Sequence, residues 1–151
     1  MKQTKFWLKL IGVAFLLHIV LIILSVMEVT VFSYLISPGE SEKYYEAHAE
    51  DSGPWISAIF GSLIIFMLIK RFIRKNNDRY LTYAVFLPVV YIAIDVLLLQ
   101  LFNISWEEHL AVFAVANGAK ILASLFSYYI FRSRSLIHDH NLQSDVHRKG
   151  M

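Results

Sequence analysis

The sequence contains no cysteine and has few charged residues for its length. Of 151 residues, 17% are charged and 57% are hydrophobic, whereas soluble domains average about 25% charged residues. The absence of cysteine excludes disulfides, thiolate metal ligands and redox chemistry at a thiol. The shortage of charge excludes a soluble domain, because too few polar side chains are present to cover its surface. Phosphate-binding loops, Ser/His/Asp spacing and metalloprotease motifs are also absent, and nothing indicates nucleic-acid binding.

Four long apolar segments predict an all-α, four-helix membrane bundle in a single transmembrane domain. About 20 apolar residues cross a bilayer, and the expected spans are 7–36, 55–73, 80–102 and 109–131. The first span exceeds the required length, so we expect its helix to tilt or to project beyond the membrane. Its apolar run is also too long for a signal peptide and lacks a cleavage site. The lipid bilayer is therefore the first predicted partner of this chain.

Positive charge is concentrated on one side of the predicted bundle. Twelve of the fourteen Lys and Arg residues fall in the segments 1–9, 70–79 and 132–151 (the polar tail), and one falls in the acidic segment 37–54. The positive-inside rule then places both termini in the cytoplasm, with the helices in up-down-up-down order. This distribution predicts a multi-pass protein of the plasma membrane, which in a bacterium is the inner membrane.

The connections differ in length. The outer connection 37–54 is long and acidic, and we expect it to contain a short helix at about 42–50. Pro54 suits the first turn of the second helix, where its missing N–H has no intrahelical partner to lose. The inner turn 74–79 and the outer loop 103–108 are short, so the last three helices are expected to be antiparallel neighbours.

Away from the ends of the predicted spans, three charged residues lie in their interior: Glu28, Asp95 and Lys120. A lysine at the centre of a span costs roughly 2.5–3.5 kcal/mol on insertion scales, so it is expected to face protein or water and to have a partner. We expect Asp95 to pair with Lys120, because their helices share a tight turn. Glu28 lies at a depth from which it can join them.

Polar residues at helical spacing form one stripe on each of three helices. The three stripes indicate that these faces of the helices line one shared interior, in the outer half of the bundle. The candidate ligand or proton site consists of His18 and Glu28 on the first helix, Tyr91 and Asp95 on the third, and Asn117 and Lys120 on the fourth. One interpretation is a polar cavity that opens outward; the other is an ion pair that only fixes the helix register.

The remaining histidines give weaker signals. We expect His18, near mid-membrane, to make an interhelical hydrogen bond, since His109 is too shallow to be a second haem ligand. No cofactor is therefore predicted. His48, Glu107 and His109 are weak metal-ligand candidates, but they lack a recognisable ligand spacing and fit a solvated acidic loop better.

Small residues predict where helices approach closely. Gly61 and Ser62 on the second helix, and Gly118 on the fourth, predict a contact face for a homo-oligomer or a partner membrane subunit. The leading functional hypothesis is transport, sensing or binding of a small solute or ion at the buried polar centre. The alternatives are a membrane-embedded enzyme that acts on a lipid-soluble substrate and a structural accessory subunit of a larger membrane complex.

Overall fold

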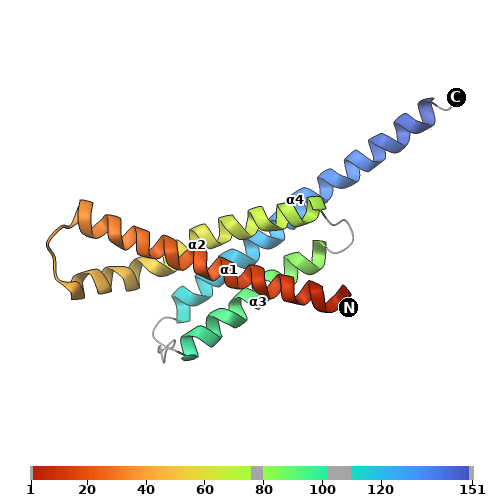
Figure 1. Ribbon diagram of the computed structural model, residues 1–151. Coiled ribbons are helices and arrows are strands. Elements are labelled where there is room, and N and C mark those ends of the chain that lie inside the picture. Colours follow the sequence, from red (N-terminus) through yellow and green to blue (C-terminus); the bar gives the residue numbers. More distant parts are fainter. Residues whose placement is uncertain (1, 76–79, 102–109, 150–151) are drawn as a thin grey trace.

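The computed structural model describes residues 2–75, 80–101 and 110–149, and these form four α-helices and one π-helical turn (Figure 1). The elements are α1 (Lys2–Val31), η1 (Phe32–Ile36), α2 (Glu42–Lys75), α3 (Tyr80–Leu101) and α4 (Leu110–Lys149). By length and composition, four segments are able to cross a membrane: Thr4–Ile36, Glu42–Ile73, Leu81–Leu101 and Leu110–Arg132. The prediction of an all-helical chain with four apolar spans is confirmed.

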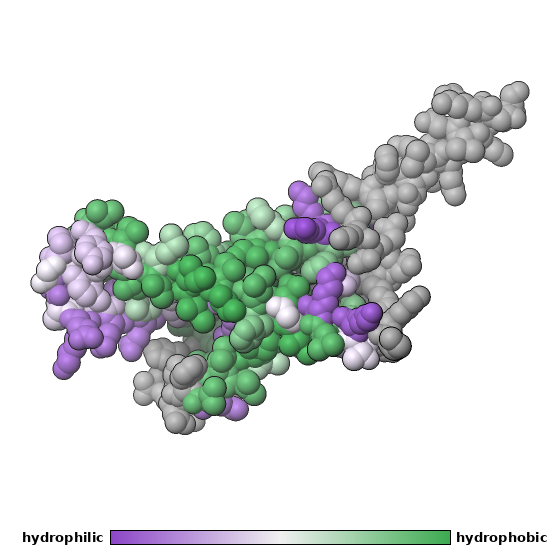
Figure 2. All heavy atoms as spheres, viewed as in Figure 1, coloured by the Kyte–Doolittle hydropathy of each residue, from purple (hydrophilic) through white to green (hydrophobic). Residues whose placement is uncertain are grey.

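The helices bury a narrow apolar core and leave much of their apolar surface exposed. The buried core includes Leu10 and Ala14 of α1, Ile65 of α2, and Ala84 and Leu87 of α3. Large apolar side chains nevertheless cover the outside of the bundle between its polar ends (Figure 2). Such a surface is unfavourable in water and suited to hydrocarbon, so the fold indicates a membrane environment.

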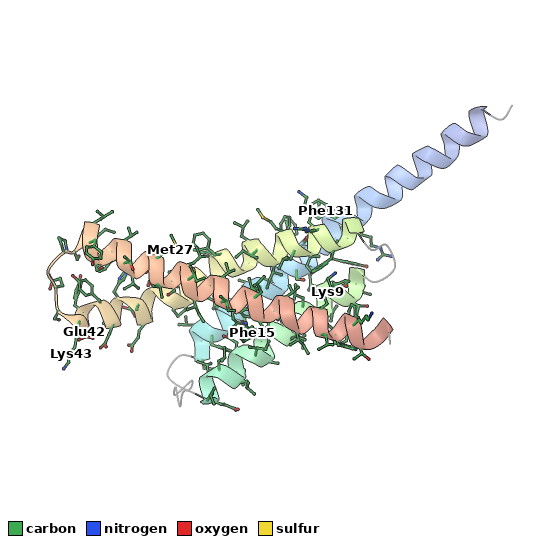
Figure 3. All side chains as sticks on the ribbon, viewed as in Figure 1. Lys9, Phe15, Met27, Glu42, Lys43 and Phe131 are labelled. Atoms are coloured by element: carbon green, nitrogen blue, oxygen red, sulfur yellow. The ribbon has the colours of Figure 1, made fainter. Side chains whose placement is uncertain are left out.

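The hairpin formed by α1 and α2 extends beyond the ends of α3 and α4 (Figure 1). Its tip carries Glu42 and Lys43, whereas Lys9 and Phe131 lie toward the opposite end of the bundle (Figure 3). Gly39 makes the turn possible with a φ of 85°, a conformation that glycine adopts without strain. The first helix projects beyond the shorter helices (Figure 1), and whether it tilts in the membrane or projects beyond it stays a prediction.

One continuous helix, α2, occupies the region where the sequence predicted a separate short helix at 42–50 and a new helix beginning at Pro54. Pro54 instead lies inside α2, which begins at Glu42. A proline removes the hydrogen bond to the carbonyl four residues earlier, and that residue, Glu50, has an exposed side chain. We infer that the freed carbonyl lies where solvent reaches it.

Two further predictions concern the ends of the helices. The outer loop 103–108 lies outside the described residues, and so does most of the inner turn 74–79. At the other end of the chain, α4 does not stop at Phe131, where the fourth span was expected to end. It continues to Lys149 and leads away from the other three helices (Figure 1).

Candidate functional site

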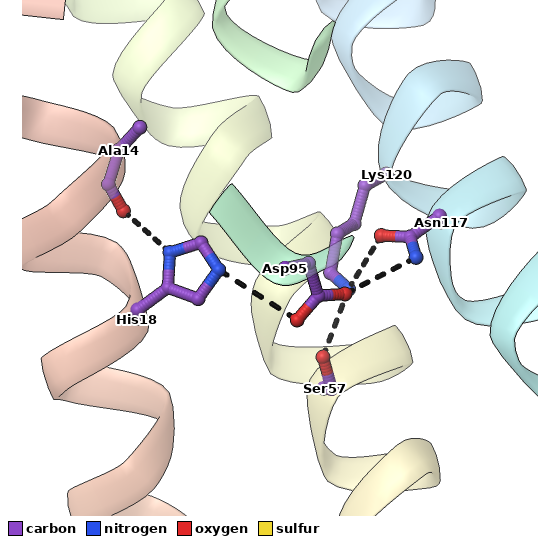
Figure 4. Close-up of polar contacts among 6 residues, drawn as sticks. All are labelled: Ala14, His18, Ser57, Asp95, Asn117 and Lys120. Atoms are coloured by element: carbon purple, nitrogen blue, oxygen red, sulfur yellow. Dashed lines mark hydrogen bonds and ion pairs between the residues drawn. The ribbon is translucent and has the colours of Figure 1, made fainter. Parts of the chain in front are cut away.

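Lys120 lies at the centre of the bundle with a side chain that is fully buried. Its Nζ donates hydrogen bonds to Ser57 Oγ at 2.8 Å and to Asn117 Oδ1 at 3.3 Å (Figure 4). The same nitrogen lies 4.6 Å from the centroid of the Tyr91 ring, within the range of a cation–π interaction. The ammonium is thus held by α2, α3 and α4 and kept away from lipid.

Gly61 gives Lys120 the space to cross the face of α2. A Cβ atom at position 61 would lie 2.7 Å from Lys120 Cε, closer than two non-bonded carbon atoms approach one another. Gly61 therefore packs inside the chain, against a side chain of its own bundle. Gly118 has no atom of the described structure within 4 Å of such a Cβ. A partner contact through Gly61, Ser62 or Gly118 stays a prediction.

Asp95 does not form the direct ion pair with Lys120 that the sequence predicted. Within the described residues, Asn117 lies between them: its Nδ2 donates to Asp95 Oδ2 at 3.3 Å, and its Oδ1 accepts from Lys120. An amide can make this bridge because it carries both donors and an acceptor. The Asp95 side chain remains 27% exposed, so it borders open space as well as protein.

His18 approaches Asp95 from α1. The interhelical hydrogen bond predicted for His18 does not form among the described residues. Its Nδ1 lies 2.9 Å from the carbonyl oxygen of Ala14 in the same helix, and its Nε2 lies 3.7 Å from Asp95 Oδ1 (Figure 4). The imidazole stacks on the Tyr91 ring, with the ring centroids 3.9 Å apart and the planes inclined by 15°. Both rings are almost completely buried, so this stack fixes how the histidine faces the carboxylate.

A cavity of about 400 Å³ opens beside these residues, between α2, α3 and α4. Its polar lining includes Ser57, Asp95, Asn117 and Lys120, and the rest is mainly apolar: Ala49, Pro54, Leu99, Val112, Phe113 and Ala116, with Glu50 as a further charged residue. Pockets of this size and character accommodate small molecules. We call it the outer pocket, since Glu50 belongs to the segment predicted to lie outside.

Sequence reasoning identified Asp95, Asn117 and Lys120 but did not assign Ser57 to the site. Ser57 and Gly61 are four residues apart and so lie on one face of α2. The sequence signal that could have identified Ser57 is its position one helical turn from Gly61, on the same face of α2. Two serines of α4, Ser124 and Ser127, are also buried, and their hydroxyls donate to the carbonyl oxygens of Ala84 and Phe66, respectively.

Glu28 does not join the site, contrary to the grouping predicted from its depth. It contacts the N-terminal part of α2 instead: His48 Nε2 lies 2.7 Å from its Oε1, and Ser52 Oγ donates to its Oε2 at 2.9 Å. Phe32 stacks on His48, with ring centroids 3.5 Å apart. These contacts hold the end of α1 and the start of η1 against α2. They form because α1 and α2 lie side by side in the projecting hairpin.

The weak metal hypothesis gains no support from the part of the chain that the structure describes. No group of three or more His, Asp or Glu side chains is arranged there to hold a metal ion. His48 is engaged with Glu28. Glu107 and His109 lie outside the described residues.

Replacing Glu28 with alanine is expected to lower the free energy of unfolding by about 1 kcal/mol. The change removes two hydrogen bonds to a carboxylate, and partial exposure keeps the effect near the lower end of the usual range. Reversible unfolding in detergent micelles measures it, with the exposed Glu46→Ala as the control. Equal losses in the two variants would show that the Glu28 contacts contribute no stability.

No protein-family model, curated protein or solved structure matches this chain. Its class therefore follows from its own residues. The four apolar helices indicate a small multi-pass membrane protein, and its polar side chains converge beside a cavity.

Proposed function

We propose that this protein binds a small amphipathic solute in the outer pocket, as the binding step of transport or sensing. The observation that carries the proposal is the position of the cavity. It lies directly beside the buried ammonium of Lys120 and the partly exposed carboxylate of Asp95. The polar groups can orient one end of a solute, while the apolar lining accommodates the remainder.

The proposal includes a topology. Both termini are cytoplasmic, the helices cross in up-down-up-down order, and the membrane is the plasma membrane, in a bacterium the inner membrane. The distribution of Lys and Arg supports this orientation. The outer pocket then opens on the side of the acidic hairpin tip, and a solute reaches it without passing the basic cytoplasmic ends.

Two features favour a binding site over an ion pair that only fixes the helix register. A structural pair is most stable when its charges are in direct contact and the space around them is filled, but Asn117 separates Asp95 from Lys120. Asp95 also accepts only one hydrogen bond within the described structure, at 3.3 Å. Its remaining acceptor capacity is available to a solute or to water in the pocket.

Filling the pocket tests this proposal. Ala116 is buried and lines the cavity, so Ala116→Phe is expected to reduce solute occupancy at least tenfold by occupying the space that the solute needs. Ala114 is an exposed residue of the same helix, and Ala114→Phe is the matched control.

Native mass spectrometry measures the occupancy of each variant after purification from the membranes in which it is expressed. The expected result is a small-molecule adduct on the wild type and on Ala114→Phe that is absent from Ala116→Phe. Equal occupancy in all three proteins, or no adduct on any of them, would rule out the outer pocket as the binding site.

A further inference from the structure

The hydrogen-bonding roles of His18 can be assigned from its partner. A carbonyl oxygen only accepts, so His18 Nδ1, at 2.9 Å from the Ala14 carbonyl, must carry a proton and donate it. In a neutral imidazole, Nε2 is then a bare acceptor. It is buried and has no hydrogen-bond partner among the described residues. The atom that it faces, Asp95 Oδ1, is also an acceptor when the carboxylate is ionised.

Two acceptors that face each other, one buried and one partly exposed, lack one proton. The separation of 3.7 Å between them is too long for a hydrogen bond, and a small side-chain movement would close it once a proton lay between them. A buried acceptor without a hydrogen-bond partner is energetically unfavourable. A proton placed between Nε2 and Oδ1 would give each of these atoms a hydrogen bond.

The charged and titratable groups around this pair come from all four helices. His18 lies on α1, Tyr91 and Asp95 on α3, and Lys120 on α4, and Glu50 of α2 lines the outer pocket. Near the base of the pocket, Asp95 and Lys120 carry opposite charges that cancel when His18 is neutral. A bound proton on the His18–Asp95 pair leaves the base with one net positive charge.

We propose that the outer pocket binds a monovalent organic anion together with one proton, which is held between His18 Nε2 and Asp95 Oδ1. This inference rests on the proposed binding function and names its ligand class. The proton adds to the pair, and an O–H···N or N–H···O bond forms across the gap. The positive charge that remains on Lys120 is balanced by the anionic group of the solute.

Charge balance is the reason for coupling the two ligands. An uncompensated charge in a low-dielectric interior is costly, so the anion alone or the proton alone is disfavoured there. Together they leave the base of the pocket neutral, whereas Glu50 lines the pocket from an exposed position of α2. The apolar lining from Leu99, Val112 and Phe113 suits the hydrocarbon part of such an anion, and benzoate is a convenient probe because an aromatic ring fits within about 400 Å³.

The coupling predicts a pH dependence for benzoate binding. Across about pH 5.5–8.5 benzoate stays ionised, and over at least one unit of this range the affinity of the wild type should fall about tenfold per pH unit, because one proton is taken up per anion. Isothermal titration calorimetry in two buffers of different ionisation enthalpy counts that proton directly. Neutral benzamide, of nearly the same shape, should show neither proton uptake nor a pH slope.

Asp95→Asn separates this mechanism from titration of Lys120. The amide resembles a protonated carboxyl in shape and charge, so the variant should bind benzoate without proton uptake and with an affinity independent of pH. A pH slope that persists in Asp95→Asn, or wild-type binding without proton uptake, overturns the inference.

Absence of benzoate binding to the wild type at every pH also overturns the inference, without affecting the native-mass test of the pocket. If Asp95→Asn does not fold, the comparison of benzoate with benzamide on the wild type still decides the question. Proton uptake with benzamide equal to that with benzoate counts against it.

Discussion

Lys120→Met is expected to lower the free energy of unfolding by about 3 kcal/mol. The substitution keeps a long unbranched side chain but removes the ammonium that Ser57, Asn117 and the Tyr91 ring surround. The Asp95 carboxylate then remains as an unbalanced charge within the bundle. Removing one member of a buried charge pair typically costs 3–5 kcal/mol, and the 27% exposure of Asp95 keeps the expected value at the lower end.

Adding Asp95→Asn to Lys120→Met should recover most of that loss. The double variant has no charge at either position, so neither charge is left without its counterpart in the bundle. The destabilisation that an unbalanced charge causes in each single variant is therefore absent. Reversible unfolding of the four proteins in mixed micelles gives the coupling energy. Lys5→Met, at an exposed lysine in the first turn of α1, should change stability by less than about 0.5 kcal/mol. Additive losses would show that the Asn117 bridge transmits no interaction between the charges.

The sequence predicted the four spans because apolar character persists over lengths that only a membrane helix requires. It also predicted that Asp95, Asn117 and Lys120 share an interior, since helical phase determines which side of a helix a residue occupies. Phase does not determine which atoms meet. The insertion of Asn117 between the two charges depends on side-chain conformations and on the space left by Gly61 on a different helix.

Glu28 and Pro54 show where reasoning from one segment at a time was insufficient. The position of Glu28 along its own helix predicts a depth from which it can join Asp95 and Lys120. The structure differs because α2 begins at Glu42 and extends beside Glu28. Pro54 was read as a helix start because proline is frequent there. It also occurs inside helices where the freed carbonyl finds water or another partner. Both errors have one cause, the unpredicted continuation of α2 from Pro54 back to Glu42.

Gly61→Val is expected to destabilise the protein by about 3 kcal/mol and to displace the Lys120 ammonium. The new Cβ would lie 2.7 Å from Lys120 Cε and 3.4 Å from Leu21 Cδ1, and the valine methyl groups require further space. Overpacking a filled interior costs typically 1–3 kcal/mol. The upper end applies here because Lys120 is fully buried and displacing its ammonium disturbs the hydrogen bonds to Ser57 and Asn117.

Gly118→Val is the matched control, since a Cβ at position 118 meets no atom of the described structure within 4 Å. It introduces the same residue into a helix of the same bundle, so it reports the intrinsic effect of valine without the clash. Unfolding in mixed micelles compares the stability of the two variants. Benzoate titration tests whether the ammonium is displaced: affinity for the anion should fall in Gly61→Val and not in Gly118→Val. If Gly118→Val proves as destabilising as Gly61→Val, the passage of Lys120 over Gly61 is not what requires a glycine there. The open surface at Gly118 would then be the more important one, as expected of a face that contacts a second chain.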